Sequence, residues 1–163
     1  MTELPDFWRT EIWHPLSVHL PLVILIFSTG FALLGFVLRK SMWSTVGHVL
    51  LIIGTVGAWS AIYTGSLADA VVVRTLCDPT VLEDHENAAY LVGWLFTAAS
   101  VVMLISFFSK LAKLRTMLSF LMILCMLIGS AILVRTGHLG AQLVYQQAAG
   151  VYTPSEDCSE FSE

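Results

Sequence analysis

MLSFLMILCMLIGSAILVRTGHL, residues 117–139, contains a single fully charged residue, Arg135. A transmembrane helix needs about 20 predominantly apolar residues to cross a hydrocarbon core of about 30 Å. Three other stretches of the sequence meet this requirement, at 16–38, 42–67 and 88–108. The chain is 56% hydrophobic and only 12% charged, whereas soluble domains are about 25% charged. The sequence therefore predicts a membrane protein with four spans.

The four spans are expected to be helices. Backbone inside a bilayer must satisfy its own hydrogen bonds, which limits spanning structures to helices and closed barrels, and the periodicity here is helical. We predict an all-α membrane protein, a four-transmembrane-helix up-down bundle. Residues 1–151 form this single domain, and 152–163 form a polar, acidic C-terminal tail. The first apolar stretch is too long for the core of a signal peptide, so we expect it to be retained as a helix.

Charged residues predict the orientation of the bundle. The first and third connections carry the basic residues Arg39, Lys40, Lys110, Lys113 and Arg115. The second connection, its flanks and the C-terminal tail carry the acidic residues Asp69, Asp78, Glu83, Asp84, Glu86, Glu156, Asp157, Glu160 and Glu163. Cytoplasmic loops are enriched in Lys and Arg. We therefore expect a multi-pass protein of the bacterial inner membrane with both termini periplasmic.

The predicted periplasmic side also holds two of the three cysteines, Cys77 and Cys158. Disulfides persist in that compartment, so a Cys77–Cys158 bridge would tie the tail to the second loop. Two unpaired thiols are the alternative. Cys125 lies in the middle of the fourth span, where we expect it to pack against neighbouring helices.

Four histidines are predicted at one level of the bundle. His14 and His19 lie at the start of the first helix, His85 precedes the third, and His138 ends the fourth. Polar side chains at membrane depth usually face the bundle interior and carry function. We predict a site formed from His19, His85 and His138, with His14, just outside the first span, as a further candidate. His48, alone on the opposite side, is expected to be structural.

These residues suit a metal or a metal-containing cofactor. Imidazole is the commonest metal ligand, and bundles build cofactor sites from facing helices. Two opposed histidines would ligate a haem iron, whereas three or four converging ones would suit copper or zinc. Gly137 and Gly140 remove bulk beside His138, and Arg135 shares its helix face. A buried Arg needs an anion, either a haem propionate or Asp69. The sequence lacks CxxCH, which excludes covalent c-type haem on this chain.

A short repeat suggests that the bundle consists of two related hairpins. Residues 63–68 (YTGSLA) and 135–140 (RTGHLG) share the pattern TG-x-L followed by a small residue, each near the end of a predicted helix. His19 and His85 lie near the starts of the preceding helices. Two hairpins related by an axis along the membrane normal would produce this pattern. Similar helix-end chemistry without a repeat is the alternative.

The sequence resembles a family of four-helix bacterial inner-membrane proteins, domain of unknown function 2231. The resemblance rests on HPLSVHLP (residues 14–21), the Gly-x-x-x-Asp of 65–69, His85, and TGHLGAQLVY (136–145). It covers about residues 13–151. Family members commonly carry an acidic residue and a His before the next Gly-Val, but this chain has QQAAGV at 146–151, so that additional ligand is missing. The resemblance implies a histidine-marked haem b site in proteins that often accompany cytochromes.

The sequence and the resemblance together lead to one functional hypothesis and two alternatives. We expect a haem-b-binding electron-transfer protein, or a small non-catalytic subunit of a respiratory oxidoreductase complex. Electrons would pass between a quinol in the membrane and a periplasmic cytochrome c, and no nucleic-acid partner is expected. One alternative is a cofactor-free structural or assembly subunit. The other is a copper or zinc binder at the periplasmic face.

Overall fold

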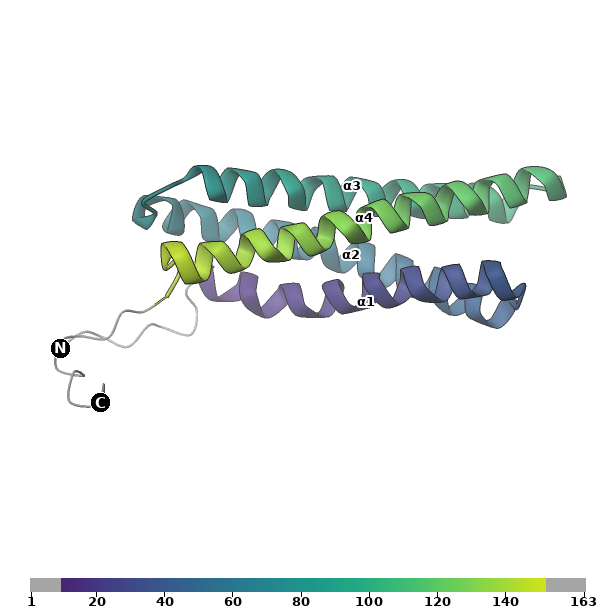
Figure 1. Ribbon diagram of the computed structural model, residues 1–163, viewed down its shortest axis with the longest axis horizontal. Coiled ribbons are helices and arrows are strands. Elements are labelled where there is room, and N and C mark those ends of the chain that lie inside the picture. Colours follow the sequence, from purple (N-terminus) through teal and green to yellow (C-terminus); the bar gives the residue numbers. More distant parts are fainter. Residues whose placement is uncertain (1–9, 152–163) are drawn as a thin grey trace.

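The fold is known from a computed structural model that describes residues 10–151. Four long helices run antiparallel to their neighbours in sequence (Figure 1). They are α1 (Thr10–Leu38), α2 (Ser41–Val72), α3 (Thr80–Phe108) and α4 (Ala112–Gln147), with a short 3-10 helix, η1 (Val73–Thr75), after α2. Each long helix is long and apolar enough to cross a membrane, and the described residues contain no strand. The predicted all-α bundle with four spans is confirmed.

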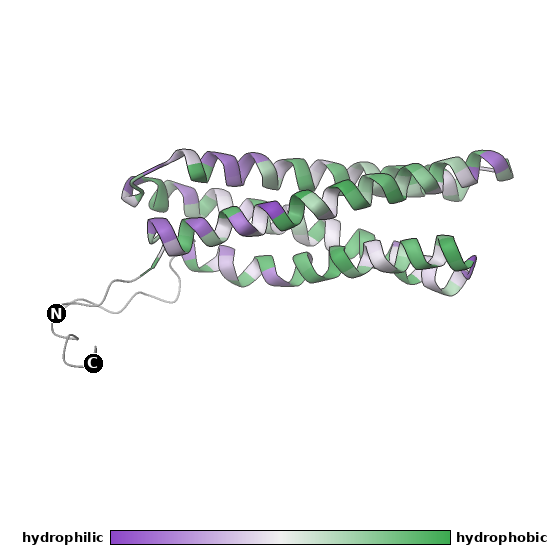
Figure 2. Ribbon diagram, in the orientation of Figure 1, coloured by the Kyte–Doolittle hydropathy of each residue, from purple (hydrophilic) through white to green (hydrophobic). Residues whose placement is uncertain are grey.

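The helices extend beyond the predicted apolar spans, chiefly at one end of the bundle. We call this end, formed by the first turns of α1 and α3 and the last turns of α2 and α4, the histidine end. At a rise of about 1.5 Å per residue, the 36 residues of α4 exceed the roughly 30 Å hydrocarbon core. Figure 2 shows apolar residues filling the middle of the helices and polar residues towards the ends. The predicted boundaries were therefore short because polar turns continue the helices outside the core.

Both Thr10 and Gln147 lie at the histidine end (Figure 1). The basic residues Arg39, Lys40 and Lys110 lie at the opposite end, in the turns after α1 and α3. The side of the membrane that each end faces stays a prediction. The tail (152–163) and Cys158 lie outside the described residues, so the predicted Cys77–Cys158 bridge also stays a prediction.

Within each hairpin, glycines let the two helices approach closely. A Cβ added at Gly54 would lie 2.6 Å from Leu25 in the first hairpin, and one added at Gly129 would lie 2.9 Å from Phe96 in the second. Leu25 and Phe96 are both completely buried. Small residues support close packing in membranes, where apolar surface alone gives little driving force. Contacts between the two hairpins are less extensive than those within them.

Hydroxyl pairs join the two hairpins in a symmetrical way. Thr29 Oγ1 on α1 lies 2.9 Å from Ser130 Oγ on α4, and Thr55 Oγ1 on α2 lies 3.2 Å from Ser100 Oγ on α3. Thr29 and Ser100 are 71 positions apart, and Thr55 and Ser130 are 75 apart. The same offsets relate Leu25 to Phe96 and its glycine partner to that of Phe96. The predicted repeat of two hairpins is therefore confirmed by packing.

The register predicted for this repeat is wrong. The TG-x-L pattern aligned Gly65 with Gly137, but the 75-residue offset between α2 and α4 aligns Gly65 with Gly140. The difference of three residues is nearly one helical turn. On α1 and α3, the 71-residue offset aligns His85 with His14 rather than with His19. The repeat is therefore defined by buried contacts, which a short sequence match does not reveal.

Candidate functional site

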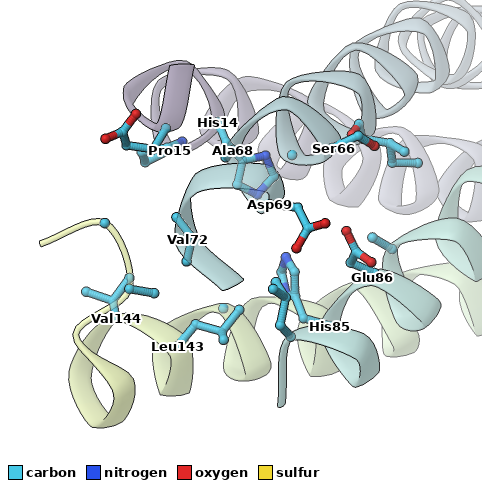
Figure 3. A pocket seen from close by; sticks show the side chains of 18 of the residues that line it. His14, Pro15, Ser66, Ala68, Asp69, Val72, His85, Glu86, Leu143 and Val144 are labelled. Atoms are coloured by element: carbon cyan, nitrogen blue, oxygen red, sulfur yellow. The ribbon is translucent and has the colours of Figure 1, made fainter. Parts of the chain in front are cut away.

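His14 and His85 meet at the centre of the histidine end. They come from α1 and α3, which are the symmetry-related helices of the two hairpins. Their ring centroids are 6.0 Å apart and the ring planes are nearly perpendicular, at 85°. Figure 3 shows the two rings projecting into the bundle from opposite sides. Both side chains are half-buried, so the repeat places two imidazoles face to face close to its own axis.

Each ring is fixed by a backbone carbonyl of the following helix. His14 Nδ1 lies 3.0 Å from Ala61 O on α2, and His85 Nδ1 lies 3.0 Å from Thr136 O on α4. A carbonyl oxygen only accepts hydrogen bonds, so Nδ1 carries the proton and donates in both cases. In the neutral ring Nε2 is then unprotonated and its lone pair is available to a metal. This is the arrangement in which metal-ligating histidines are commonly held.

A glycine makes room for each ring. Gly65 and Gly140 follow the two accepting carbonyls by four residues, one turn along the same helix face. An added Cβ at Gly65 would lie 3.1 Å from His14 Cε1 and Nδ1, and one at Gly140 would lie 3.2 Å from His85 Cε1. Each hairpin therefore supplies the same unit of a histidine, an accepting carbonyl and a glycine.

Two cavities flank the histidine pair, and both are bordered by His14 and His85. The wide cavity, of about 450 Å³, is lined on α1 and α4 by residues that include Leu22 and Gly137. The narrow cavity, of about 160 Å³, is lined on α2 and α3 by residues that include Ile62. The repeat relates Ile62 to Gly137, so the branched side chain fills space on one side that the glycine leaves open on the other.

The narrow cavity is acidic. Asp69 on α2 and Glu86 on α3 both line it, and Figure 3 shows their carboxylates directed toward one another beside His85. At the positions that the repeat relates to these two, the wide cavity is lined by Val144 and Pro15. A ligand that spans both cavities would therefore keep its own anionic groups away from the narrow one.

Comparison with known proteins identifies the family. The family described as Predicted membrane protein (DUF2231) matches residues 12–153. The chain belongs to this family. The matched region contains all four helices and both histidines of the central pair, and the family description names no activity. No curated protein and no solved structure matches the sequence.

The other two predicted histidines of this DUF2231 protein lie apart from the central pair. His19 is exposed on α1, and its Nδ1 donates to Pro15 O of the same helix at 2.6 Å; it lines the wide cavity. His138 is exposed on α4, where its Nε2 lies 3.4 Å from Gln142 Nε2. Of the four predicted ligands, the structure brings together His14 and His85.

The remaining predicted site residues are also separated. Arg135 is exposed on α4, whereas Asp69 lines the narrow cavity on α2, so within residues 10–151 the predicted contact between them is not formed. A Cβ at Gly137 would meet only Leu22, at 4.0 Å, while Gly140 contacts His85. Among the described residues, no group of three or more His, Cys, Asp or Glu side chains could hold a metal ion. The convergent cluster expected for copper or zinc does not occur there.

The importance of His14 was underestimated because the predicted first helix began at residue 16. In the structure α1 begins at Thr10, so His14 lies in its second turn and reaches α2. The sequence does contain a usable signal. His14 precedes His85 by 71 residues, and each contacts a small residue, Gly65 or Gly140, in the following helix. Aligning the histidines first would have given the correct register.

Proposed function

We propose that this DUF2231 protein binds haem b between His14 and His85 and uses it to transfer electrons within the membrane. One observation carries the proposal. Two half-buried imidazoles face one another across the bundle, each with Nδ1 donating to a backbone carbonyl. Each Nε2 lone pair is thereby left to a central metal ion. A bis-histidine haem needs this pair of donors.

The spacing of the two rings fits a single metal ion between them. Bonds from a metal to an imidazole nitrogen are about 2.0–2.1 Å long, so two rings that ligate one ion from opposite sides have centroids about 6 Å apart. The centroids of His14 and His85 are 6.0 Å apart. The carbonyl partners also raise the basicity of the two ligands and fix the ring orientation.

The surroundings of the pair fit a flat macrocycle. The cavities of about 450 and 160 Å³ lie on either side of the histidines, so a plate centred between the rings would extend into both. The carboxylates of Asp69 and Glu86 would repel propionates from the narrow cavity, which favours placing them elsewhere. Arg135, exposed on α4, is the proposed countercharge for the propionates.

Haem b held by two histidines would supply a one-electron carrier. The chain's contribution is to fix both imidazole tautomers and to enclose the site among apolar helices. We propose that the protein lies in the bacterial inner membrane with the histidine end periplasmic, because the basic residues occupy the opposite end. It would accept electrons from a quinol or partner haem and pass them to a periplasmic cytochrome c, alone or as a respiratory subunit.

A cofactor-free structural or assembly subunit is the second candidate. The hydroxyl pairs between the hairpins, Thr29 with Ser130 and Thr55 with Ser100, favour it because they join the helices without a cofactor. In that case His14 and His85 would only connect each hairpin internally through their carbonyl bonds. The two candidates differ in one measurable property, the presence of haem.

The test is a reduced-minus-oxidised spectrum of the protein purified in detergent from haem-replete cells. We expect the sharp α-band of a bis-histidine haem b, and we expect His14→Ala and His85→Ala each to abolish it. His19→Ala and His138→Ala are matched controls at the same end of the bundle and should leave the band unchanged. Absence of a Soret peak would refute haem binding. Loss of the band in the controls but not in the other two variants would move the ligands.

A further inference from the structure

We propose that the hydroxyl groups of Ser17 and Thr64 tune the bond that holds His14 and make His14 and His85 unequal ligands. The inference rests on the proposed haem site. Thr64 lies on α2, one turn beyond Ala61 and beside the glycine that faces His14. Ser17 lies on α1, one turn beyond His14. The two hydroxyls therefore lie where the two helices meet around the ring.

Three short contacts connect these hydroxyls to the His14 unit. Thr64 Oγ1 lies 2.9 Å from Ala61 O, the carbonyl that accepts the His14 Nδ1 proton. Ser17 Oγ lies 2.8 Å from Thr64 Oγ1 and 2.9 Å from His14 O. All three distances are typical of hydroxyl hydrogen bonds.

The number of protons does not match the number of contacts. Each hydroxyl donates a single hydrogen bond, so two protons serve three contacts. In one arrangement Ser17 donates to Thr64 and Thr64 donates to Ala61 O. In the other, Thr64 donates to Ser17 and Ser17 donates to His14 O. A third choice, in which both hydroxyls donate to carbonyls, would leave their two oxygens 2.8 Å apart with no proton between them.

The two arrangements treat His14 differently. In the first, Ala61 O accepts from Thr64 in addition to His14 Nδ1 and the helical N–H of residue 65. A carbonyl oxygen has two lone pairs, so the third donor weakens the bond to His14. In the second arrangement Ala61 O is left to the ring and the helix. A stronger Nδ1–H bond makes Nε2 a better donor to a metal, so the direction of the hydroxyl pair sets the ligand strength of His14.

His85 has no such pair. The repeat relates Ser17 to Ala88 and Thr64 to Leu139, and both of these side chains are apolar. The hydroxyl of Thr136 donates to Ile132 O, in the preceding turn of its own helix, at 2.9 Å. The carbonyl that holds His85 is therefore free of a competing hydroxyl among the described residues. The two histidines, equivalent in the backbone, are unequal in their hydrogen bonding.

Two substitutions should shift the haem midpoint potential in opposite directions. Thr64→Val removes the competing donor, strengthens His14 as a ligand, favours the ferric state and shifts the potential to a lower value. Ser17→Ala removes the acceptor needed for the second arrangement, holds Thr64 on Ala61 O and shifts the potential to a higher value. Ser60→Ala is the matched control, because this exposed α2 hydroxyl bonds only within its own helix, to Val56 O, and should give no shift.

The same pair of variants can be tested without haem. In the haem-free protein in detergent, the His14 Nδ1 proton resonance should move downfield in Thr64→Val and upfield in Ser17→Ala, because stronger hydrogen bonds deshield the proton. If no preparation binds haem, the proposed function fails, and this measurement still decides the inference. Opposite shifts support it. Shifts in one direction, or no larger than that of Ser60→Ala, overturn it, since a merely structural role would not produce opposite signs.

Discussion

Adding one methyl group behind each ligating ring should weaken ligand binding without unfolding the protein. The two sites are Gly65 and Gly140, where an added Cβ would lie 3.1 and 3.2 Å from the ring atoms of His14 and His85. These separations are shorter than ordinary van der Waals contact, so Gly65→Ala or Gly140→Ala must push the ring aside by a few tenths of an ångström. Each ring bonds its carbonyl at 3.0 Å, so this displacement stretches the bond that fixes the tautomer.

The expected loss follows from that bond. A typical intramolecular hydrogen bond contributes about 0.5–1.5 kcal/mol net, and each 1.4 kcal/mol is a tenfold change in affinity. Each single variant should therefore bind haem about three- to tenfold more weakly. The folded protein itself should not suffer, because Ala is favoured over Gly inside a helix by about 0.5–1 kcal/mol. Binding and stability should thus change in opposite directions.

Haem titration of the detergent-solubilised protein, followed at the Soret band, measures the affinity, and thermal unfolding of the haem-free protein measures the fold. Gly30→Ala is the control, since no atom lies within 4 Å of its added Cβ, and it should leave affinity unchanged. Gly137→Ala is a second control, because only Leu22, at 4.0 Å, is near. If Gly65→Ala and Gly140→Ala bind haem as tightly as these controls, the central histidines are not the ligands.

Other features make separate predictions. Thr29→Val and Ser100→Ala, related by the repeat, should each lower the free energy of unfolding by a similar amount, about 0.6–2 kcal/mol; unequal losses in chemical unfolding would contradict the repeat. In a background without other cysteines, Glu83→Cys should react with a membrane-impermeant maleimide in intact cells and Lys110→Cys should not; the reverse labelling would invert the proposed orientation. Replacing Glu83 and Asp84 by Lys should slow electron transfer to a basic cytochrome c about tenfold at low salt, and a stopped-flow rate that stays slow at high salt would exclude charge steering.

The spans could be predicted from the sequence because hydropathy reports directly on the environment of each segment. Their ends could not, since a helix that leaves the hydrocarbon core continues into water wherever its own hydrogen bonds and packing support it. α3 begins at Thr80 and not at residue 88, and α4 continues to Gln147. The additional turns matter for function, because His85 lies in the extension of α3.

The candidate site could be predicted in its location but not in its membership. Sequence spacing places His14, His19, His85 and His138 at one end of the bundle, and a four-helix topology requires no more than that. Which ring faces inward depends on the rotation of each helix, and this rotation is set by contacts such as Leu25 with its glycine on α2. His138 follows Arg135 by three residues and shares its exposed face, so the most recognisable motif of the sequence turns outward.

The repeat explains why the two ligands occur as a pair. A single hairpin offers one histidine with one free Nε2, and two copies related by an axis between them bring two such nitrogens to that axis from opposite sides. Sequence drift then acts on an already symmetrical site. Ile62 against Gly137 makes the two cavities unequal, and Thr64 against Leu139 makes the two ligands unequal. The first difference sets the side on which a macrocycle has room, and the second sets which histidine holds the iron more weakly.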